Sequence, residues 1–526
     1  MTGALPRRRL LALSAGAGLV LGTGLGAPQL LSGAPRTGEL VRSRLPLPQP
    51  FQVPLPIPPT LQPVEQRPDA DVYEIVQQQA RQQILPGVDT TVWGYQGSFP
   101  GPTIESRRGR TTIVRHRNEL PVPTVVHLHG GRTPPESDGY PTDLVLPVGS
   151  DHDQQAGHGH AGPMHDPDAV ISHGAATYTF PLEQRASMLW YHDHRMDFTG
   201  PQIYRGLAGL HLVRDDEEDA LPLPAGDREL PLMITDRAFE ADGSFRYPSV
   251  DPTLRTTPGV QEPYIEGVFG DVILVNGAPW PVHEVTGTRH RLRILNASNA
   301  RRYDLALDPP PPGGHGLVQI GSDQGLLELP RAHDRLPIAP AERYDVVVDF
   351  GRYPVGSTVT LVNRLGTGST AQVMQFVITG TGVEHSMVPD RLSRIEPLQR
   401  SQAARVREFD FRAGTVHGRH GWRIGGKPFS PTRIDAAPAL GEVEIWRFVA
   451  DLHHPIHLHL VNFRVLSRGT GGPSPYDGGL KDTVDLRPGE AVEVIARFDG
   501  YRGRFVFHCH NAEHEDMAMM ANFAVT

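Results

Sequence analysis

Cysteine is nearly absent from this sequence, since Cys509 is the single one among 526 residues. A lone cysteine cannot form a disulfide within its own chain, so it is inert, reactive or a metal ligand. No basic block outside the N-terminus offsets the formal net charge of −9, which argues against non-specific nucleic-acid binding. Because no polar-flanked run of about 20 strongly apolar residues is present, the sequence predicts no stable membrane span.

The N-terminus has the composition of an export signal. Residues 1–34 combine a basic start at Arg7, Arg8 and Arg9 with a moderately apolar, glycine-rich run that ends in small residues. The paired arginines followed by leucines resemble a twin-arginine signal, although the Ser or Thr that usually precedes them is missing. We therefore expect an exported, secreted or cell-envelope protein, and we favour a cleaved signal over a membrane anchor.

Glycine and proline are abundant, with 56 and 51 residues. Runs rich in valine and isoleucine, such as DVILVNG and EAVEVIARF, recur between them and predict an all-β protein with many turns. The proline-rich residues 35–70 predict an extended arm. Two polar stretches divide the remainder, which predicts three β-domains at 71–215, 216–385 and 386–526. The segment DVYEIVQQQARQQIL, residues 71–85, is ambiguous between helix and strand.

Histidines occur in pairs separated by one residue, and each pair follows a strand-like run. The pairs are His127 and His129, His192 and His194, His457 and His459, and His508 and His510. Alternate side chains of a strand point to the same face, so both imidazoles of a pair would project to one side. A single pair is more often a core or surface doublet, but four pairs argue against that alternative. Eight imidazoles exceed the capacity of one ion, which predicts a multinuclear metal centre.

Cys509 lies between two of these histidines, so on a strand its side chain points away from theirs, toward a separate site. There it can meet His454 and His514. A thiolate, two histidines and a weak axial methionine are the ligand set of a blue-copper electron-transfer centre. Met519 is the natural axial candidate, while Met517 and Met520 are alternatives that could also be core packing.

With these residues the sequence resembles the multicopper oxidase family. The four copper motifs of the family are matched, in order, by HLHG, WYHDH, HPIHLH and HCHNAEHEDMAM. The surrounding stretches, among them VWGYQGSFPGPTIE, VVHLHGGRTPPESDGYP and NASNARRYDLAL, resemble the bacterial subgroup that contains spore-coat laccase, bilirubin oxidase and phenoxazinone synthase. The likeness runs from about residue 50 to the C-terminus. It implies an all-β fold of three cupredoxin-like Greek-key β-sandwich domains.

The resemblance also implies four copper ions and assigns their ligands. The type 1 copper would be held by His454, Cys509, His514 and Met519; the type 2 copper by His127 and His457; and the two type 3 coppers by His129, His192 and His510 and by His194, His459 and His508. In the family, the type 1 site takes electrons from substrate and the three-copper cluster reduces dioxygen between the first and third domains.

The function that the resemblance implies is a laccase-like oxidation of small aromatic reductants. One-electron oxidation of phenolic or aminophenolic donors would be coupled to four-electron reduction of dioxygen to water. The alternative is a metallo-oxidase of cuprous or manganous ions. Metal-oxidising relatives often carry methionine-rich insertions, whereas this chain has 10 methionines and three of them lie at the C-terminal site, which favours organic donors. A copper-free scaffold or a copper carrier would not need the complete ligand set.

Reduction of dioxygen also needs protons, so acidic groups must lie near the cluster. Asp138 and Glu515 match acidic residues of this subgroup and are the candidate proton relays. The alternatives are a turn residue at Asp138, because Asp-Gly is a common turn dipeptide, and a histidine-orienting partner at Glu515.

A histidine-rich loop lies between the first two motifs. Its histidines are His152, His158, His160 and His165. The loop could bind an extra metal ion, although glycine-rich loops of this kind are more often solvated or bind metal adventitiously.

Overall fold

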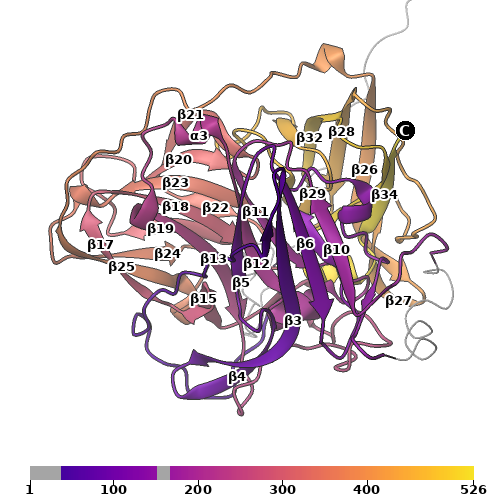
Figure 1. Ribbon diagram of the computed structural model, residues 1–526, viewed down its shortest axis with the longest axis horizontal. Helices are drawn as coiled ribbons and strands as arrows, with labels where there is room; N and C mark the ends of the chain where they lie inside the picture. The colour runs from indigo at the N-terminus through magenta and orange to yellow at the C-terminus, as the bar shows by residue number, and fades with distance from the viewer. Residues whose placement is uncertain (1–36, 151–165) are drawn as a thin grey trace, which may run out of the picture. The chain divides into compact units, whose positions relative to one another are not determined.

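The computed structural model describes residues 37–150 and 166–526. The expected export signal at residues 1–34 and the histidine-rich loop with His152 to His165 lie outside the described residues. The described chain consists mostly of β-strands joined by turns and short helices (Figure 1). This confirms the all-β prediction, as glycine and proline punctuate short strands of β-branched and aromatic residues.

The first group of strands, indigo to magenta in Figure 1, forms two sheets with the orders β10-β6-β3-β2, in which β4 also pairs with β3, and β5-β12-β11-β7. Their bounds are β2 Glu65–Gln66, β3 Ala70–Leu85, β4 Val88–Tyr95, β5 Gly101–Arg107, β6 Thr111–Asn118, β7 Val126–His129, β10 Ala175–Phe180, β11 Ser187–Asp193 and β12 Ala208–Arg214. The ambiguous residues 71–85 belong to the strand β3, because they pair in parallel with β6 and antiparallel with β4.

The second group, pink to orange in Figure 1, forms a seven-stranded sheet, β16-β15-β13-β18-β23-β20-β21, and a five-stranded sheet, β17-β25-β24-β19-β22. The bounds are β13 Glu229–Arg237, β15 Val272–Val275, β16 Ala278–Pro279, β17 Val282–Gly287, β18 Arg289–Asn296, β19 Tyr303–Asp308, β20 Leu317–Ser322, β21 Gly325–His333, β22 Leu336–Ile338, β23 Arg343–Asp349, β24 Thr358–Asn363 and β25 Gln372–Thr381. Buried aliphatic and aromatic side chains from both sheets form one core cluster.

The third group, orange to yellow, forms the sheets β27-β26-β28-β32-β30 and β31-β29-β33-β34. The bounds are β26 Arg405–Val416, β27 Arg419–Ile424, β28 Glu442–Ala450, β29 His454–Leu458, β30 Phe463–Arg468, β31 Thr483–Leu486, β32 Ala491–Phe498, β33 Gly503–Cys509 and β34 Met520–Val525. The core between them includes Cys509 and Met519.

The proline-rich segment from residue 37 to 64 crosses between these groups in an extended conformation. Its strand β1 (Glu39–Leu40) pairs with β14 (Val268–Phe269), and Pro54 and Thr60 form single bridges with Val282 and Thr103. The α-helices are short: α2 Thr199–Arg205, α3 Asp216–Asp219 and α4 Ala512–Asp516. None of the helices in the described part of the chain has the length and apolar character needed to cross a membrane.

Two strand registers place the histidines. In the first group, His127 of β7 lies opposite His192 of β11. In the third group, His457 of β29 lies opposite His508 of β33, and Ile456 lies opposite Cys509. Adjacent strands hold paired residues about 4.5–5.5 Å apart, so each register brings imidazoles from distant segments into contact.

Candidate metal centre

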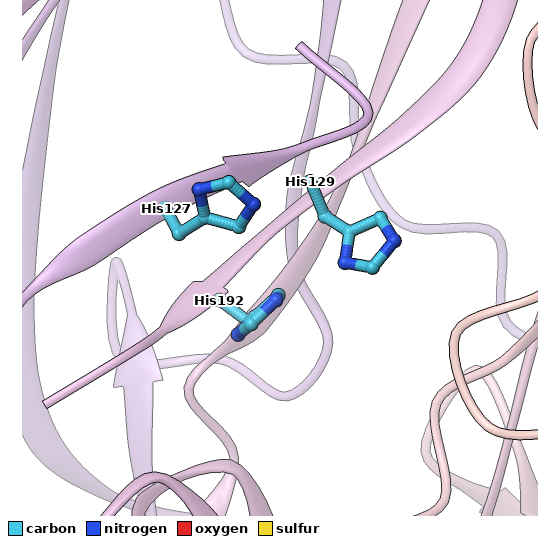
Figure 2. Close-up of side chains that lie close together, drawn as sticks. All are labelled: His127, His129 and His192. Carbon is cyan, nitrogen blue, oxygen red and sulfur yellow. The ribbon is translucent and has the colours of Figure 1, made fainter. Parts of the chain in front are cut away.

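The eight paired histidines meet at one buried place. Figure 2 shows three of them, His127 and His129 on one strand and His192 on its neighbour. The rings of His129 and His457 stack with centroids 3.6 Å apart, and those of His127 and His459 with centroids 3.8 Å apart. Contacts therefore join the first and third groups of strands directly through their imidazoles.

Three imidazoles of the cluster use Nδ1 for a hydrogen bond and leave Nε2 without a partner. Nδ1 of His127, His192 and His457 donates to the carbonyl oxygens of Asp138, Asp193 and Asp482, at 2.6, 2.8 and 2.9 Å. The Nε2 atoms of these three histidines are buried and have no partner among the described residues. Unpaired buried polar atoms are rare in native proteins, so these nitrogens fit a bound cation.

A second set of ring nitrogens converges at the cluster. Nε2 of His508 lies 3.3 Å from Nε2 of His194 and 3.3 Å from Nε2 of His459. Burial lowers the pKa of His194 to about 4 and that of His192 to about 3, so these rings are neutral and offer lone pairs at physiological pH. Three imidazole nitrogens facing one point are a ligand set for copper.

Asp138 connects two histidines of the cluster. Its carbonyl oxygen accepts from His127, and its carboxylate accepts from His459 Nδ1 at 2.7 Å and from Thr133 Oγ1 at 3.0 Å. Burial raises the pKa of Asp138 to about 7, despite the hydroxyl of Thr133. The carboxyl can therefore gain or lose a proton near neutral pH, 1% exposed and beside the cluster.

Glu515 is the second acid at the cluster, and its pKa is shifted in the opposite direction from that of Asp138. Its Oε1 lies 3.3 Å from His194 Nδ1, and its Oε2 lies 3.1 Å from His508 Nδ1. Burial alone would raise the pKa of Glu515, but its interactions with the facing imidazoles of His508 and His194 outweigh burial and hold the pKa well below its usual range. Thr199 Oγ1 also donates to Oε1, at 2.7 Å.

Cys509 lies at a separate site on the other face of β33. Its Sγ is 3.5 Å from Nδ1 of His454 and 3.6 Å from Nδ1 of His514, and these two nitrogens are 3.1 Å apart. The Nε2 atoms are engaged elsewhere, with Asp451 Oδ1 at 2.9 Å for His454 and the Glu266 carbonyl oxygen at 3.2 Å for His514. Two unprotonated Nδ1 atoms and a sulfur thus converge where a cation fits.

The Cys509 thiol and the three methionines near it differ in their surroundings. Burial raises the pKa of the Cys509 thiol well above its usual value, so a bound cation is needed to keep it as a thiolate. Met519 is fully buried in the same core, and its backbone accepts from Cys509 N and donates to the His514 carbonyl oxygen. Met517 is partly buried, packs against this core and also lines a surface cavity, whereas Met520 packs in a different cluster.

Sequence motifs did not reveal the residues that orient the ligands. Asp482 accepts from His129 Nε2 at 3.1 Å and from both terminal nitrogens of Arg343, at 2.7 and 2.6 Å. Trp422 covers His514, with ring centroids 3.7 Å apart. Asp451 precedes His454 by three residues, so a search for carboxylates near each ligand could have found it, whereas Trp422 and Arg343 carry no local signal.

Comparisons with known proteins agree with this geometry. Family models described as "Multicopper oxidase" match residues 397–526, 77–155 and 152–218. A laccase of Bacillus subtilis (strain 168) is 37% identical over 90% of this chain and 98% of its own length, and the bilirubin oxidase of Albifimbria verrucaria is 36% identical over 90% of this chain and 81% of its own length. The crystal structure of a laccase from Pediococcus acidilactici superimposes with a TM-score of 0.78 at 30% identity, covering 92% of this chain and 96% of that one.

Proposed function

This chain belongs to the multicopper oxidase family, and from this premise we propose roles for its individual residues. It is a laccase-like oxidoreductase that uses four copper ions, one type 1, one type 2 and two type 3. It couples one-electron oxidation of phenolic and aminophenolic donors to four-electron reduction of dioxygen to water. Bound copper supplies the one-electron redox chemistry at the Cys509 site and the dioxygen chemistry at the histidine cluster.

We assign the electron-accepting site to Cys509 and its neighbours. The proposed type 1 ligands are His454, Cys509, His514 and Met519. The observation that carries the assignment is the convergence of two Nδ1 atoms and one Sγ within 3.6 Å, while the other nitrogen of each ring is held by Asp451 or Glu266. Cys509 also continues along the backbone into two histidines of the cluster, which provides a covalent path for electrons.

The histidine cluster is the proposed site of dioxygen reduction. His127 and His457 are the proposed type 2 ligands, and the proposed type 3 ligands are His129, His192 and His510 for one ion and His194, His459 and His508 for the other. The grouping of His194, His459 and His508, whose ligand atoms lie within 4.8 Å of one another, supports the second set. The neighbouring group of His127, His129 and His192 spans the proposed type 2 and type 3 positions.

Two acids are the proposed proton relays for this reduction. Asp138 has a pKa near neutrality, so its carboxyl can take up a proton and release it beside the cluster, where its Oδ2 accepts from His459 Nδ1. The two carboxylate oxygens of Glu515 face His194 and His508. We propose that Glu515 attracts and passes on protons, with Thr199 Oγ1 as its hydrogen-bonded neighbour.

The groups of strands suggest the domain boundaries, and the N-terminal sequence suggests the cellular location. We propose three cupredoxin-like domains at residues 71–215, 216–385 and 386–526, preceded by an arm at 35–70. The three pairs of sheets, which end at Arg214, Thr381 and Val525, support these bounds. We also propose export through the twin-arginine-like residues 1–34, which cell fractionation of an Arg8→Lys, Arg9→Lys variant would test.

Oxygen uptake tests the function. We expect copper-loaded protein to consume dioxygen with 2,6-dimethoxyphenol and with an aminophenol, without releasing peroxide. Uptake with cuprous ion alone would instead indicate a metallo-oxidase. The matched variant is Cys509→Ser, for which we expect loss of the blue absorption and of turnover while the histidine cluster still binds copper. A Cys509→Ser protein with full turnover would contradict the proposed electron path.

A further inference from the structure

The two histidines at the Cys509 site are hydrogen-bonded to oxygens of different charge. Nδ1 of each ring faces Cys509 Sγ, so Nε2 carries the ring proton and donates it. His454 Nε2 donates to the carboxylate Oδ1 of Asp451 at 2.9 Å, whereas His514 Nε2 donates to the neutral carbonyl oxygen of Glu266 at 3.2 Å. The two imidazoles are 0% and 1% exposed. The ring of His454 thus has a charged hydrogen-bond partner, and that of His514 has a neutral one.

The backbone fixes the carboxylate of Asp451 in this position. Asp451 directly follows β28 and precedes His454 by three residues. Its Oδ2 accepts from Ala413 N of β26 at 2.7 Å, and its Oδ1 accepts from Leu452 N at 2.7 Å. Its own backbone nitrogen donates to the carbonyl oxygen of Phe411 at 3.2 Å. Because backbone donors hold both carboxylate oxygens, the hydrogen bond to His454 is already in place before a cation binds.

The second acid near His454 is neutralised by an arginine. Asp485 also acts on His454, but its Oδ2 forms an ion pair with Arg302. Arg302 lies against the ring of His453 as well, with 2.9 Å between Nη1 and Nδ1. Within residues 37–150 and 166–526, no arginine or lysine forms an ion pair with Asp451. The negative charge of Asp451 is therefore directed at the imidazole of His454.

We propose that Asp451 lowers the reduction potential of the type 1 copper and thereby restricts the enzyme to easily oxidised donors. The inference rests on the proposed function, in which His454 holds this copper through Nδ1. In the electron-transfer step, a phenolic donor loses one electron and releases its proton to water, and the electron reduces a cupric ion to a cuprous ion. Asp451 touches neither the donor nor the ion, so it acts through His454 as a positioning residue.

The physical reason is that a carboxylate favours the higher charge of the copper ion. A hydrogen bond from a ligating imidazole to a carboxylate makes the imidazole a more basic ligand. The negative charge also attracts the doubly charged cupric ion more strongly than the singly charged cuprous ion. Both effects stabilise the oxidised site, so they lower its reduction potential. Water screens this charge only in part, because the Asp451 side chain is 25% exposed and His454 is buried.

A redox titration of the copper-loaded protein, followed through its blue absorption, measures this effect. Loss of a carboxylate partner of a metal-ligating histidine weakens metal binding about 10–100-fold. We expect the cupric form of Asp451→Asn to lose about tenfold more affinity than the cuprous form, which raises the reduction potential by about 59 mV. The rate with phenol relative to that with 2,6-dimethoxyphenol, which is easier to oxidise, should rise as well.

Asp410→Asn is the matched control. Asp410 lies on β26 next to Phe411, and the ring centroids of Phe411 and His454 are 6.3 Å apart. Its side chain is 41% exposed and faces Arg412 rather than a proposed ligand. The substitution removes one negative charge near the site but no hydrogen bond to an imidazole, so the reduction potential should stay at the wild-type value.

The proposal is wrong if Asp451→Asn titrates at the wild-type potential or if Asp410→Asn shifts the potential equally. If Asp451→Asn binds no copper, Asp451→Glu and Asp451→Gln decide, because their side chains have the same length and differ in charge. A higher potential for Asp451→Gln than for Asp451→Glu supports the proposal, and equal potentials or loss of the blue absorption in both overturn it. Failure of the proposed function is distinguishable, since the copper-loaded wild type would then itself lack the blue absorption.

Discussion

Arg343 belongs to the second group of strands, yet its side chain reaches the histidine cluster. Its terminal nitrogens bond to both oxygens of Asp482, and Asp482 in turn contacts His129. Both partners are 1% exposed, so removing the guanidinium leaves an unpaired buried charge. We expect Arg343→Met to lower the free energy of unfolding by roughly 3–5 kcal/mol and to weaken copper binding about 10–100-fold, as measured by denaturant titration and by competition with a chelator.

The matched control is an arginine at the surface. Arg497 bonds to Glu396 at 2.7 Å, but the two side chains are 34% and 70% exposed. Arg497→Met should lower the free energy of unfolding by about 0–1 kcal/mol and leave copper binding unchanged. Equal losses in the two variants would show that Arg343 has no special role beside the cluster.

The sequence predicts the metal-binding residues better than the residues that orient them. The spacing of the histidine pairs follows from strand periodicity, so the convergence of His457 and His508 could be anticipated from local patterns. Asp482 and Arg343 are 139 residues apart and meet only through tertiary contacts. No local pattern encodes such a contact, and a single sequence therefore cannot reveal it.

The turn after the short helix η1 (Pro135–Ser137) is the element that supports β7. Gly139 has a φ of 73°, and a Cβ there would lie 2.1 Å from the carbonyl oxygen of Val126. Gly139→Ala must push on β7 and so on His127, whose Nδ1 bonds to the Asp138 carbonyl oxygen. We expect the free energy of unfolding to fall by more than the roughly 1–2 kcal/mol that an alanine costs in the left-handed region. We also expect an altered electron paramagnetic resonance signal of the type 2 copper.

Gly87 provides the comparison for this turn. It has a φ of 77°, but a Cβ there would meet nothing within 4 Å. Gly87→Ala should therefore lower the free energy of unfolding only by the cost of an alanine in the left-handed region, and its copper spectrum should be that of the wild type. If the two alanine variants have the same stability and the same spectrum, the turn does not position β7.

Element types follow from composition except where tertiary pairing decides. Glutamine-rich residues within 71–85 favour a helix locally, but the parallel ladder with β6 and the antiparallel ladder with β4 impose a strand. By contrast, β33 is a strand by composition as well as by pairing, since it reads GRFVFHC. Elements with conflicting local and tertiary preferences are those that a sequence leaves undecided.

On the scale of the whole molecule, a buried ion network joins the first and second groups of strands. Glu229, at the start of β13, bonds to Arg214 at the end of β12 and to Arg293 of β18, and Glu218 of α3 bonds to the same two arginines. Burial alone would raise the pKa of Glu229, but the charges of Arg293, Arg291 and Arg214 overcome it and lower the pKa to about 2. The carboxylate form is thus selectively stabilised in the folded chain.

This shift predicts how stability depends on pH. The pKa of Glu229 is lower in the folded than in the unfolded chain, so its contribution is complete above about 4.5 and disappears as pH falls toward about 2. A shift of this size corresponds to about 3 kcal/mol. We expect Glu229→Gln to be less stable than the wild type at pH 7 and the difference to shrink toward pH 2, as measured by urea unfolding. Glu408→Gln, whose side chain is 59% exposed beside Arg447, should follow the wild-type curve throughout. If Glu229→Gln ran parallel to the wild type from pH 7 to pH 2, acid sensitivity would have to arise at other carboxylates.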